Sequence, residues 1–229
     1  MLEVEGKHGV VYPTLISHRK ELALVDTGYP LEVEAVKQAI DDAGFSADKL
    51  TCILLTHQDL DHIGCAKELA ELSGAQVGAH EDEAPYIQGD KTPVKLARRE
   101  ALLPTLNEEE RAWVGTMRAA YDKLKLPVDL WLKDGEVLPV CGGIEVIHTP
   151  GHTPGHTCFY VARDETLIAG DALNMREGSL TGPAPQHTVD LERAVDSNAR
   201  LAQYEINHTI TYHSGLFEGD LSVALREME

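Results

Sequence analysis

The densest group of side chains that could bind a metal lies at residues 57–62, His-Gln-Asp-Leu-Asp-His. In a loop that leaves a strand, His57, Asp59 and Asp61 can converge on one side, and His62 can turn toward a second point. Imidazole and carboxylate groups together suit zinc, iron or manganese. The alternative is a polar loop in which Asp61 caps the helix that follows.

Three further segments place potential ligands at the ends of predicted strands. The run HTPGHTPGHT carries His148, His152 and His156, and its two Pro-Gly pairs favour tight turns that bring the rings close together. Asp171 and His213 each follow a short apolar run. Each segment is weak evidence alone, because Gly/Pro loops with incidental histidines and Asp turn residues are common. Strand ends, however, hold ligands rigidly.

The elements predicted around these segments form two blocks of strands, each followed by helices. Strands are expected over 10–17, 22–25, 52–55, 76–79, 137–140, 144–148, 159–162, 166–169 and 209–212. Helices are expected over 31–43, after residue 63, after an Asp190 cap with Leu191, Ala194, Val195 and Leu201 on one face, and at the C-terminus. This order predicts two sheets packed together with helices outside.

The segment from about residue 85 to residue 133 is expected to be a helical insert. Asn107 and Glu110 form a capping-box pattern. An apolar stripe follows at helical spacing: Trp113, Met117, Ala120, Tyr121 and Leu124. We expect the insert to supply a substrate wall or lid. The same apolar stripe is equally expected if the insert only packs against the rest of the chain, or if it forms the face of a homodimer.

Length, charge and cysteine usage narrow the class of protein. A chain of 229 residues suits one domain over 1–229. The net charge of -18 disfavours nucleic acid and anionic membranes as partners. The N-terminus has no signal-peptide pattern, and no apolar stretch is long enough to cross a membrane. Four widely spaced cysteines predict buried thiols. We therefore expect a cytoplasmic protein that acts on a small molecule.

In chain order, THQDLDHIG, HTPGHTPGH, AGD and YHSG resemble the signature of the metallo-β-lactamase superfamily, and VDTG at 25–28 resembles its early Asp motif. The resemblance covers nearly the whole chain outside the insert. The repeated TPGH and the helix before the last His resemble most the branch of hydroxyacylglutathione hydrolases and acyl-homoserine lactonases. The resemblance implies an α/β fold, the αββα metallo-β-lactamase-like sandwich, with metals at one edge between the sheets.

The resemblance also implies a ligand set for two divalent metal ions. One metal would be held by His57, Asp59 and His152, the other by Asp61, His62 and His213, and Asp171 would bridge them together with a water or hydroxide. Four residues would lie behind the ligands: Asp26, His80, His148 and His156. For His80 the alternative is an ordinary histidine on the solvated surface.

The chain departs from the family signature at Asp59, where the family usually has His. With Asp61, Asp171 and a bridging hydroxide, Asp59 gives four negative charges, which neutralise two dications. A more neutral cluster is a poorer Lewis acid and tolerates a harder metal, so iron or manganese becomes more plausible relative to zinc. Zinc is still the expected metal, because the family precedent outweighs this argument.

We expect a dinuclear metal-dependent hydrolase that cleaves an ester-like bond, such as a lactone or thioester. A hydroxide bridging the metals would attack the carbonyl carbon, and Asp61 would accept a proton. The alternative is an iron-dependent redox or sulfur-oxidising enzyme, which the carboxylate at Asp59 favours and the lack of a flavodoxin-like domain disfavours. Acidic charge argues against a nuclease, and the complete ligand set argues against a non-catalytic metal-binding scaffold.

Overall fold

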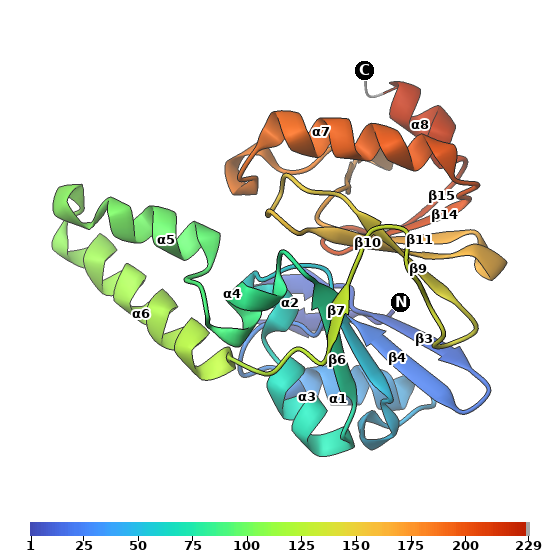
Figure 1. Cartoon of the computed structure of the whole chain (residues 1–229), viewed down its shortest axis with the longest axis horizontal. Helices are drawn as coiled ribbons and strands as arrows, with labels where there is room; N and C mark the ends of the chain where they lie inside the picture. Colours follow the sequence, from blue (N-terminus) through green and yellow to red (C-terminus); the bar gives the residue numbers. More distant parts are fainter. Residues whose placement is uncertain (228–229) are drawn as a thin grey trace.

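The computed structural model describes residues 1–227 and shows two β-sheets packed face to face, with helices on both outer faces (Figure 1). The first sheet has the order β3 (Thr14–His18), β4 (Glu21–Val25), β5 (Cys52–Leu55), β6 (Gln76–His80) and β7 (Leu130–Leu132). The second has the order β15 (Gly215–Glu218), β14 (His208–Thr211), β11 (Thr166–Gly170), β10 (Thr157–Val161), β9 (Ile144–His148) and β8 (Val137–Leu138). The predicted αββα sandwich is confirmed.

Alternating side chains on the first sheet build two separate cores. On β5, Cys52 and Leu54 face the second sheet, whereas Ile53 and Leu55 face the helices on the other side. Those helices are α1 (Val33–Asp42) and α3 (Ala66–Ser73). Because β5 is buried on both faces, its sequence is a continuous apolar run rather than an alternating one.

The second sheet repeats the arrangement with its own outer core. On β10, Phe159 and Val161 pack between the sheets, and Cys158 and Tyr160 pack outward. The outer layer consists of α7 (Leu191–Ala199) and α8 (Leu221–Glu227), which lie above this sheet in Figure 1. The chain therefore stacks four layers around three apolar interfaces.

Strand direction decides where the polar loops emerge. β4, β5, β6 and β7 run parallel in the first sheet, and β11 runs parallel to β14 in the second. Parallel strands end at the same edge, so the residues after β4, β5, β11 and β14 leave the two sheets together. These residues are Asp26, His57, Asp171 and His213, with Thr56 and Tyr212 between strand and ligand at two of them.

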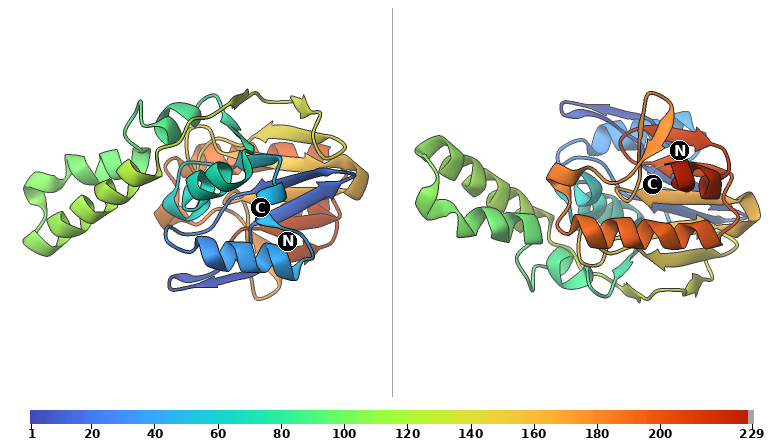
Figure 2. Two further views of the ribbon diagram at one scale, coloured as in Figure 1. Left: turned by 90° about the horizontal axis from the view of Figure 1, so that it is seen from below. Right: turned by 90° about the horizontal axis from the view of Figure 1, so that it is seen from above.

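The insert between β6 and β7 forms a helical arm. It contains α4 (Ala84–Gln88), α5 (Val94–Ala101), a 3-10 turn at Leu103–Thr105 and α6 (Glu108–Leu124). α5 and α6 project from the sandwich as a hairpin, which both views of Figure 2 show. The predicted capping box of Asn107 and Glu110 is present. The predicted end of the insert at residue 133 is wrong, because β7 is already the edge strand of the first sheet.

Two predicted apolar faces are also partly wrong. In α6 the buried face is Val114, Tyr121 and Leu124, and Trp113 is 52% exposed because it lies one residue, about 100° of turn, away from Val114. In α7 the Asp190 cap is confirmed by its bond from Arg193 N. Val195, however, is 55% exposed, because Ala194, Ser197 and Asn198 form the buried face.

Several short strands differ from the sequence-based assignment. The strand expected over 10–17 is divided into β2 (Gly9–Val11) and β3, with Pro13, which has no N–H to donate, between them. β2 pairs with β1 (Val4–Gly6), and β12 (Asn174–Arg176) pairs with β13 (Ser179–Thr181). These pairs and β15 were not predicted, because segments of three or four residues carry little periodicity.

All four cysteines are buried and free, as predicted. Across residues 1–227, no helix has both the length and the apolar character that crossing a membrane requires.

Gly64 limits how the loop at residues 57–62 can sit on the first sheet. A Cβ atom at this position would lie 2.3 Å from the Gly28 carbonyl oxygen and 2.4 Å from Pro30 N, both of them backbone atoms. We expect Gly64→Ala to lower the free energy of unfolding by about 1–3 kcal/mol, because rigid backbone must move. The matched control is Gly115→Ala in α6, where a Cβ meets nothing within 4 Å.

In Gly115→Ala the free energy of unfolding should rise by about 0.5–1 kcal/mol, because alanine replaces a glycine in an exposed helix interior. Urea unfolding of both variants measures the difference. Equal stabilities for Gly64→Ala and the parent would mean that the loop at residue 64 does not press against residues 28–30.

Candidate metal centre

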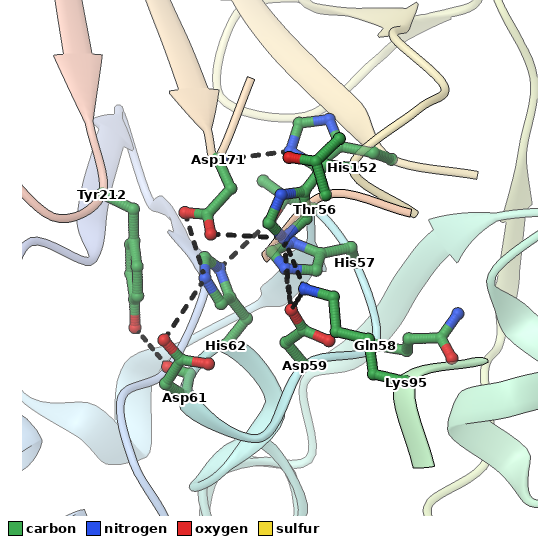
Figure 3. Close-up of polar contacts among 12 residues, drawn as sticks. Thr56, His57, Gln58, Asp59, Asp61, His62, Lys95, His152, Asp171 and Tyr212 are labelled. Carbon is green, nitrogen blue, oxygen red and sulfur yellow. Dashed lines mark hydrogen bonds and ion pairs between the residues drawn. The ribbon is translucent and has the colours of Figure 1, made fainter. Parts of the chain in front are cut away.

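The seven predicted ligands meet at the shared edge of the two sheets, and Figure 3 labels six of them. His57 follows β5, and Asp61 and His62 lie in the short helix α2 (Leu60–Ile63). His152 comes from the loop between β9 and β10, and Asp171 directly follows β11. The predicted alternative, in which Asp61 caps a helix, is wrong: Asp59 has the N-cap position and its side chain makes no cap bond.

One half of the centre joins His57, Asp59, His152 and Asp171. Asp59 Oδ2 lies 3.1 Å from His57 Nε2 and 3.2 Å from His152 Nε2. Asp171 Oδ2 lies 3.3 Å from the same His152 nitrogen. All four side chains are at least mostly buried, with Asp59 13% exposed and Asp171 11%.

The other half joins Asp61, His62, His213 and Asp171. Asp171 Oδ1 lies 3.4 Å from His62 Nε2 and 3.2 Å from His213 Nε2. Asp61 Oδ2 lies 3.4 Å from His213 Nε2 and 3.8 Å from His62 Nε2. Asp171 therefore turns one carboxylate oxygen to each half. The His213 side chain is 33% exposed, so the centre opens on this side.

These spacings match those around a small metal ion. Bonds of about 2.0–2.1 Å in a tetrahedral site place neighbouring ligand atoms about 3.3 Å apart. The buried Nε2 atoms of His57 and His62 have no hydrogen-bond partner, although carboxylate oxygens lie within 3.4 Å of each. These nitrogens therefore do not point at the oxygens, as a hydrogen bond would require. The donor set of imidazoles and carboxylates fits a divalent cation.

Asp26 and Thr56 fix the two imidazoles that leave the first sheet. Asp26 Oδ2 lies 2.8 Å from His62 Nδ1 and accepts from the Thr56 hydroxyl at 2.8 Å, while Asp26 Oδ1 accepts from Thr56 N. The Thr56 hydroxyl is in turn 3.0 Å from His57 Nδ1. With Nδ1 engaged on both rings, Nε2 is left to face the centre, which is the usual arrangement behind a metal-bound histidine.

His156 supports the centre from the second sheet. Its Nε2 accepts from the backbone N–H of Asp171 at 3.1 Å, which leaves its Nδ1 facing the Thr149 hydroxyl at 2.8 Å. The ring is fully buried, and burial lowers its pKa well below the usual range. A neutral ring that accepts from a backbone amide holds the Asp171 loop in place.

His148 and His80 lie one step further out. His148 Nε2 is 3.1 Å from the carbonyl of Pro154, within the loop that carries His152. His80 is buried and stacks on His148, with ring centroids 3.9 Å apart, so the solvated-surface alternative for His80 is wrong. Within residues 1–227, no hydrogen bond joins either ring to the seven predicted ligands.

Glu83 is a buried acid that the sequence analysis missed. One carboxylate oxygen accepts from the backbone N–H of Gln58 at 3.0 Å and from the Gln58 amide at 2.8 Å, and the other accepts from Gly155 N at 2.7 Å. Glu83 thus ties the loop of His57 and Asp59 to the loop of His152. Its only sequence signal is Pro85 at the start of α4, which marks Glu83 as a helix N-cap.

Tyr212 is the first residue of the YHSG motif, and the sequence alone predicts no role for it. Its hydroxyl donates to the carbonyl of Asp61 at 2.5 Å and accepts from Gly28 N at 3.0 Å. Its ring packs on that of His62, with centroids 3.9 Å apart. Burial raises the pKa of Tyr212 well above its usual value, so the hydroxyl keeps its proton and can donate.

Lys95 was also missed, because it lies 36 residues from Asp59 in the helical insert. Its ammonium contacts Asp59 Oδ2 and lies 2.9 Å from His152 Nε2 (Figure 3). Nothing in the spacing of the insert distinguishes Lys95 from its other basic residues.

The buried Glu83 predicts a pH dependence of stability. Burial raises the pKa of Glu83 from 4.5 to about 7, although the side chains of Thr153 and Gln58 and the backbone N–H of Gly155 oppose the shift. The folded chain then keeps a proton that the unfolded chain releases, so stability is full below pH 4.5 and falls as the pH rises to about 7. The loss from this group is on the order of 3 kcal/mol.

Glu83→Gln should remove this part of the pH dependence. We expect the free energy of unfolding of the metal-free parent to fall more steeply between pH 5 and pH 7.5 than that of the variant, whatever their absolute stabilities. Urea unfolding in chelator at four pH values measures both slopes. Parallel curves would show that Glu83 is ionised in the folded chain throughout this range.

Comparison with known proteins agrees with this geometry. The family model of the metallo-beta-lactamase superfamily matches residues 6–213. A probable metallo-hydrolase of Bacillus subtilis, YflN, is 26% identical over 91% of this chain and 84% of its own length. A hydroxyacylglutathione hydrolase of Pseudomonas paraeruginosa is 31% identical over 67% of this chain, but over only 43% of its own length.

Two solved structures have the same architecture. TTHA1429, a metallo-beta-lactamase family protein of Thermus thermophilus, superposes with a TM-score of 0.78 at 27% identity, covering 99% of this chain and 76% of that one. TTHA1623, solved in a di-iron-bound form, gives a TM-score of 0.68 at 24% identity over 99% of this chain and 96% of its own. The chain belongs to the metallo-β-lactamase superfamily.

Proposed function

We propose that this protein is a metal-dependent hydrolase of an ester-like carbonyl compound, such as a lactone or thioester. The observation that carries the proposal is that the Nε2 atoms of His57 and His62 have no hydrogen-bond partner and lie at metal-ligand spacing from carboxylate oxygens. These oxygens are Asp59 Oδ2 at 3.1 Å from His57 and Asp171 Oδ1 at 3.4 Å from His62. The relatives named hydroxyacylglutathione hydrolase, from two organisms, support a thioester among the candidate substrates.

The half around His213 is the one that would hold the hydrolytic metal, because Asp61, His62, His213 and Asp171 meet there without a competing cation among the described residues. A divalent metal bound by these residues supplies a Lewis acid for the carbonyl oxygen and a water of lowered pKa. The sequence implied a second metal in the other half, where Lys95 lies. Zinc stays the expected metal, with iron or manganese as alternatives.

The chain's own residues position this chemistry. Asp26 and Tyr212 fix the ring of His62 and the backbone of Asp61, and Glu83 fixes the opposite loop. Asp61 lies on the open side next to His213, with its side chain 19% exposed, and is the candidate to accept a proton. Burial raises its pKa, and a bound cation opposes that shift.

The helical arm is proposed to shape access to the substrate. Lys95, at the base of the arm, reaches the centre, whereas α6 begins at the end of the arm farthest from the sandwich (Figure 1). The exposed Trp113 lies in the first half of α6, so the arm also fits the predicted alternative of a homodimer face. A small-molecule substrate and a cytoplasmic location, with which the free thiols agree, stay predictions.

The carboxylate of Asp59, where the family usually has a histidine, is the reason to keep one alternative function. A carboxylate in this position favours a harder metal such as iron, and with it the redox or sulfur-oxidising reaction considered from the sequence. Metal analysis of protein purified without added metal separates the zinc hydrolase from the iron enzyme.

Removal of a central ligand tests the proposed function. We expect His213→Ala and Asp171→Asn to lose metal and to reduce kcat/KM by two to three orders of magnitude or more, because they remove a ligand of the Lewis acid. His148→Ala is the matched control. His148 lies in the same region, but its ring contacts the carbonyl of Pro154 and not a predicted metal ligand. The variant should therefore keep its metal and most of its activity.

Metal content is measured by mass spectrometry, and activity on one aryl ester, one lactone and one thioester. Hydrolysis by Asp171→Asn at the parent rate would contradict the role of Asp171 as a metal ligand. Loss of metal from His148→Ala would show that His148, not His152, is the ligand from its loop.

A further inference from the structure

The strongest feature that the proposed function leaves unused is the ammonium group of Lys95, in the first turn of α5. It contacts Asp59 Oδ2 and lies 2.9 Å from His152 Nε2 (Figure 3). The two side chains of this ion pair are 22% and 13% exposed. Of the Lys and Arg ion pairs in residues 1–227, it is the least exposed, so solvent screens it least.

A chain of hydrogen bonds fixes the start of α5 against the centre. The backbone N–H of Val94 donates to Gln58 Oε1 at 2.7 Å, and the amide of Gln58 donates to the buried Glu83. Lys95 therefore follows an anchored residue, and Gln58 lies between the two predicted ligands His57 and Asp59. This position is set by the fold rather than by a freely rotating surface side chain.

We infer that the Lys95 ammonium is the resident cation of the half formed by His57, Asp59 and His152, and that the chain binds one metal ion, in the half around His213. This inference rests on the proposed metal dependence and concerns how many metals bind.

Competition for one lone pair supports the inference. A charged ammonium is only a donor, so the hydrogen bond from Lys95 to His152 uses the Nε2 lone pair of the ring protonated at Nδ1. This tautomer cannot also donate from Nε2 to Asp59 Oδ2, which lies 3.2 Å away. A metal in this half requires the same lone pair and the same Asp59 oxygen. Lys95 and a metal can therefore not both bind these two atoms.

Charge balance supports it as well. Asp59, Asp61 and Asp171 carry three negative charges, and one dication with Lys95 carries three positive charges, so the sum is zero. Two dications with Lys95 would give five positive charges, a net of plus two before any hydroxide. The carboxylate at position 59, which departs from the family signature, is thus matched by the lysine that contacts it.

The test is the number of metal ions bound, measured by mass spectrometry after equilibration with excess Zn²⁺ and desalting. We expect one zinc per chain in the parent and two in Lys95→Met, which keeps the length of the side chain and removes its charge. Lys123→Met, which removes an exposed lysine of α6, is the matched control and should stay at one. The double variant Asp59→His/Lys95→Met, with the usual family ligands, should bind two.

Lys95→Gln serves if Lys95→Met does not fold, because its amide can still donate to Asp59; it should also bind two. Two zinc ions in the parent, or one in folded Lys95→Met or Lys95→Gln, would overturn the inference. Failure of the proposed function looks different: the parent would bind no zinc, or a chelator would leave its hydrolysis of the three test substrates unchanged.

Discussion

Three carboxylates, those of Asp59, Asp61 and Asp171, share one largely buried edge, and their mutual repulsion is the constraint on which the centre depends. Like charges within a few ångströms cannot all stay ionised in a poorly solvated place without cations between them. The four imidazoles aimed into the same space are neutral ligands or weak cations, so they do not balance three negative charges by themselves. A divalent metal and the Lys95 ammonium are the two cations that this geometry accommodates.

The fold satisfies this constraint by holding each acid and each ring from behind. Asp26 lies in the left-handed backbone region, with φ of 58°, and from there its carboxylate reaches both Thr56 and His62. Such strain persists only where the surroundings compensate for it. Glu83 and Tyr212 act in the same way on the loops, through backbone amides and a carbonyl. The ligands therefore depend on residues that never face the centre.

The sequence predicted the sandwich, and the seven residues that it proposes as ligands lie together in the structure, because both signals are local and dense. A continuous apolar run such as β5, followed at once by THQDLDH, specifies strand, edge and ligand in about ten residues. Glu83, Lys95 and β7 were missed because their roles arise from contacts across tens of residues. Glu83 is one of three consecutive acids at residues 81–83, and Lys95 is one of several basic residues in the insert, so each is singled out only by the tertiary fold.

The sequence predicted the arm as a lid or a dimer face. In the inference above, the base of the arm has a different role, which is to supply the Lys95 ammonium to the centre. An insertion between β6 and β7 begins beside the ligand edge, because β6 runs parallel to β5 and ends where β5 ends. The second helix of the insert, α5, brings its first turn back to this edge, where Gln58 and Glu83 anchor it. A single basic residue in this turn can supply a cation without changing the sandwich. Metal number in this fold can therefore depend on an insert as well as on the ligand motif.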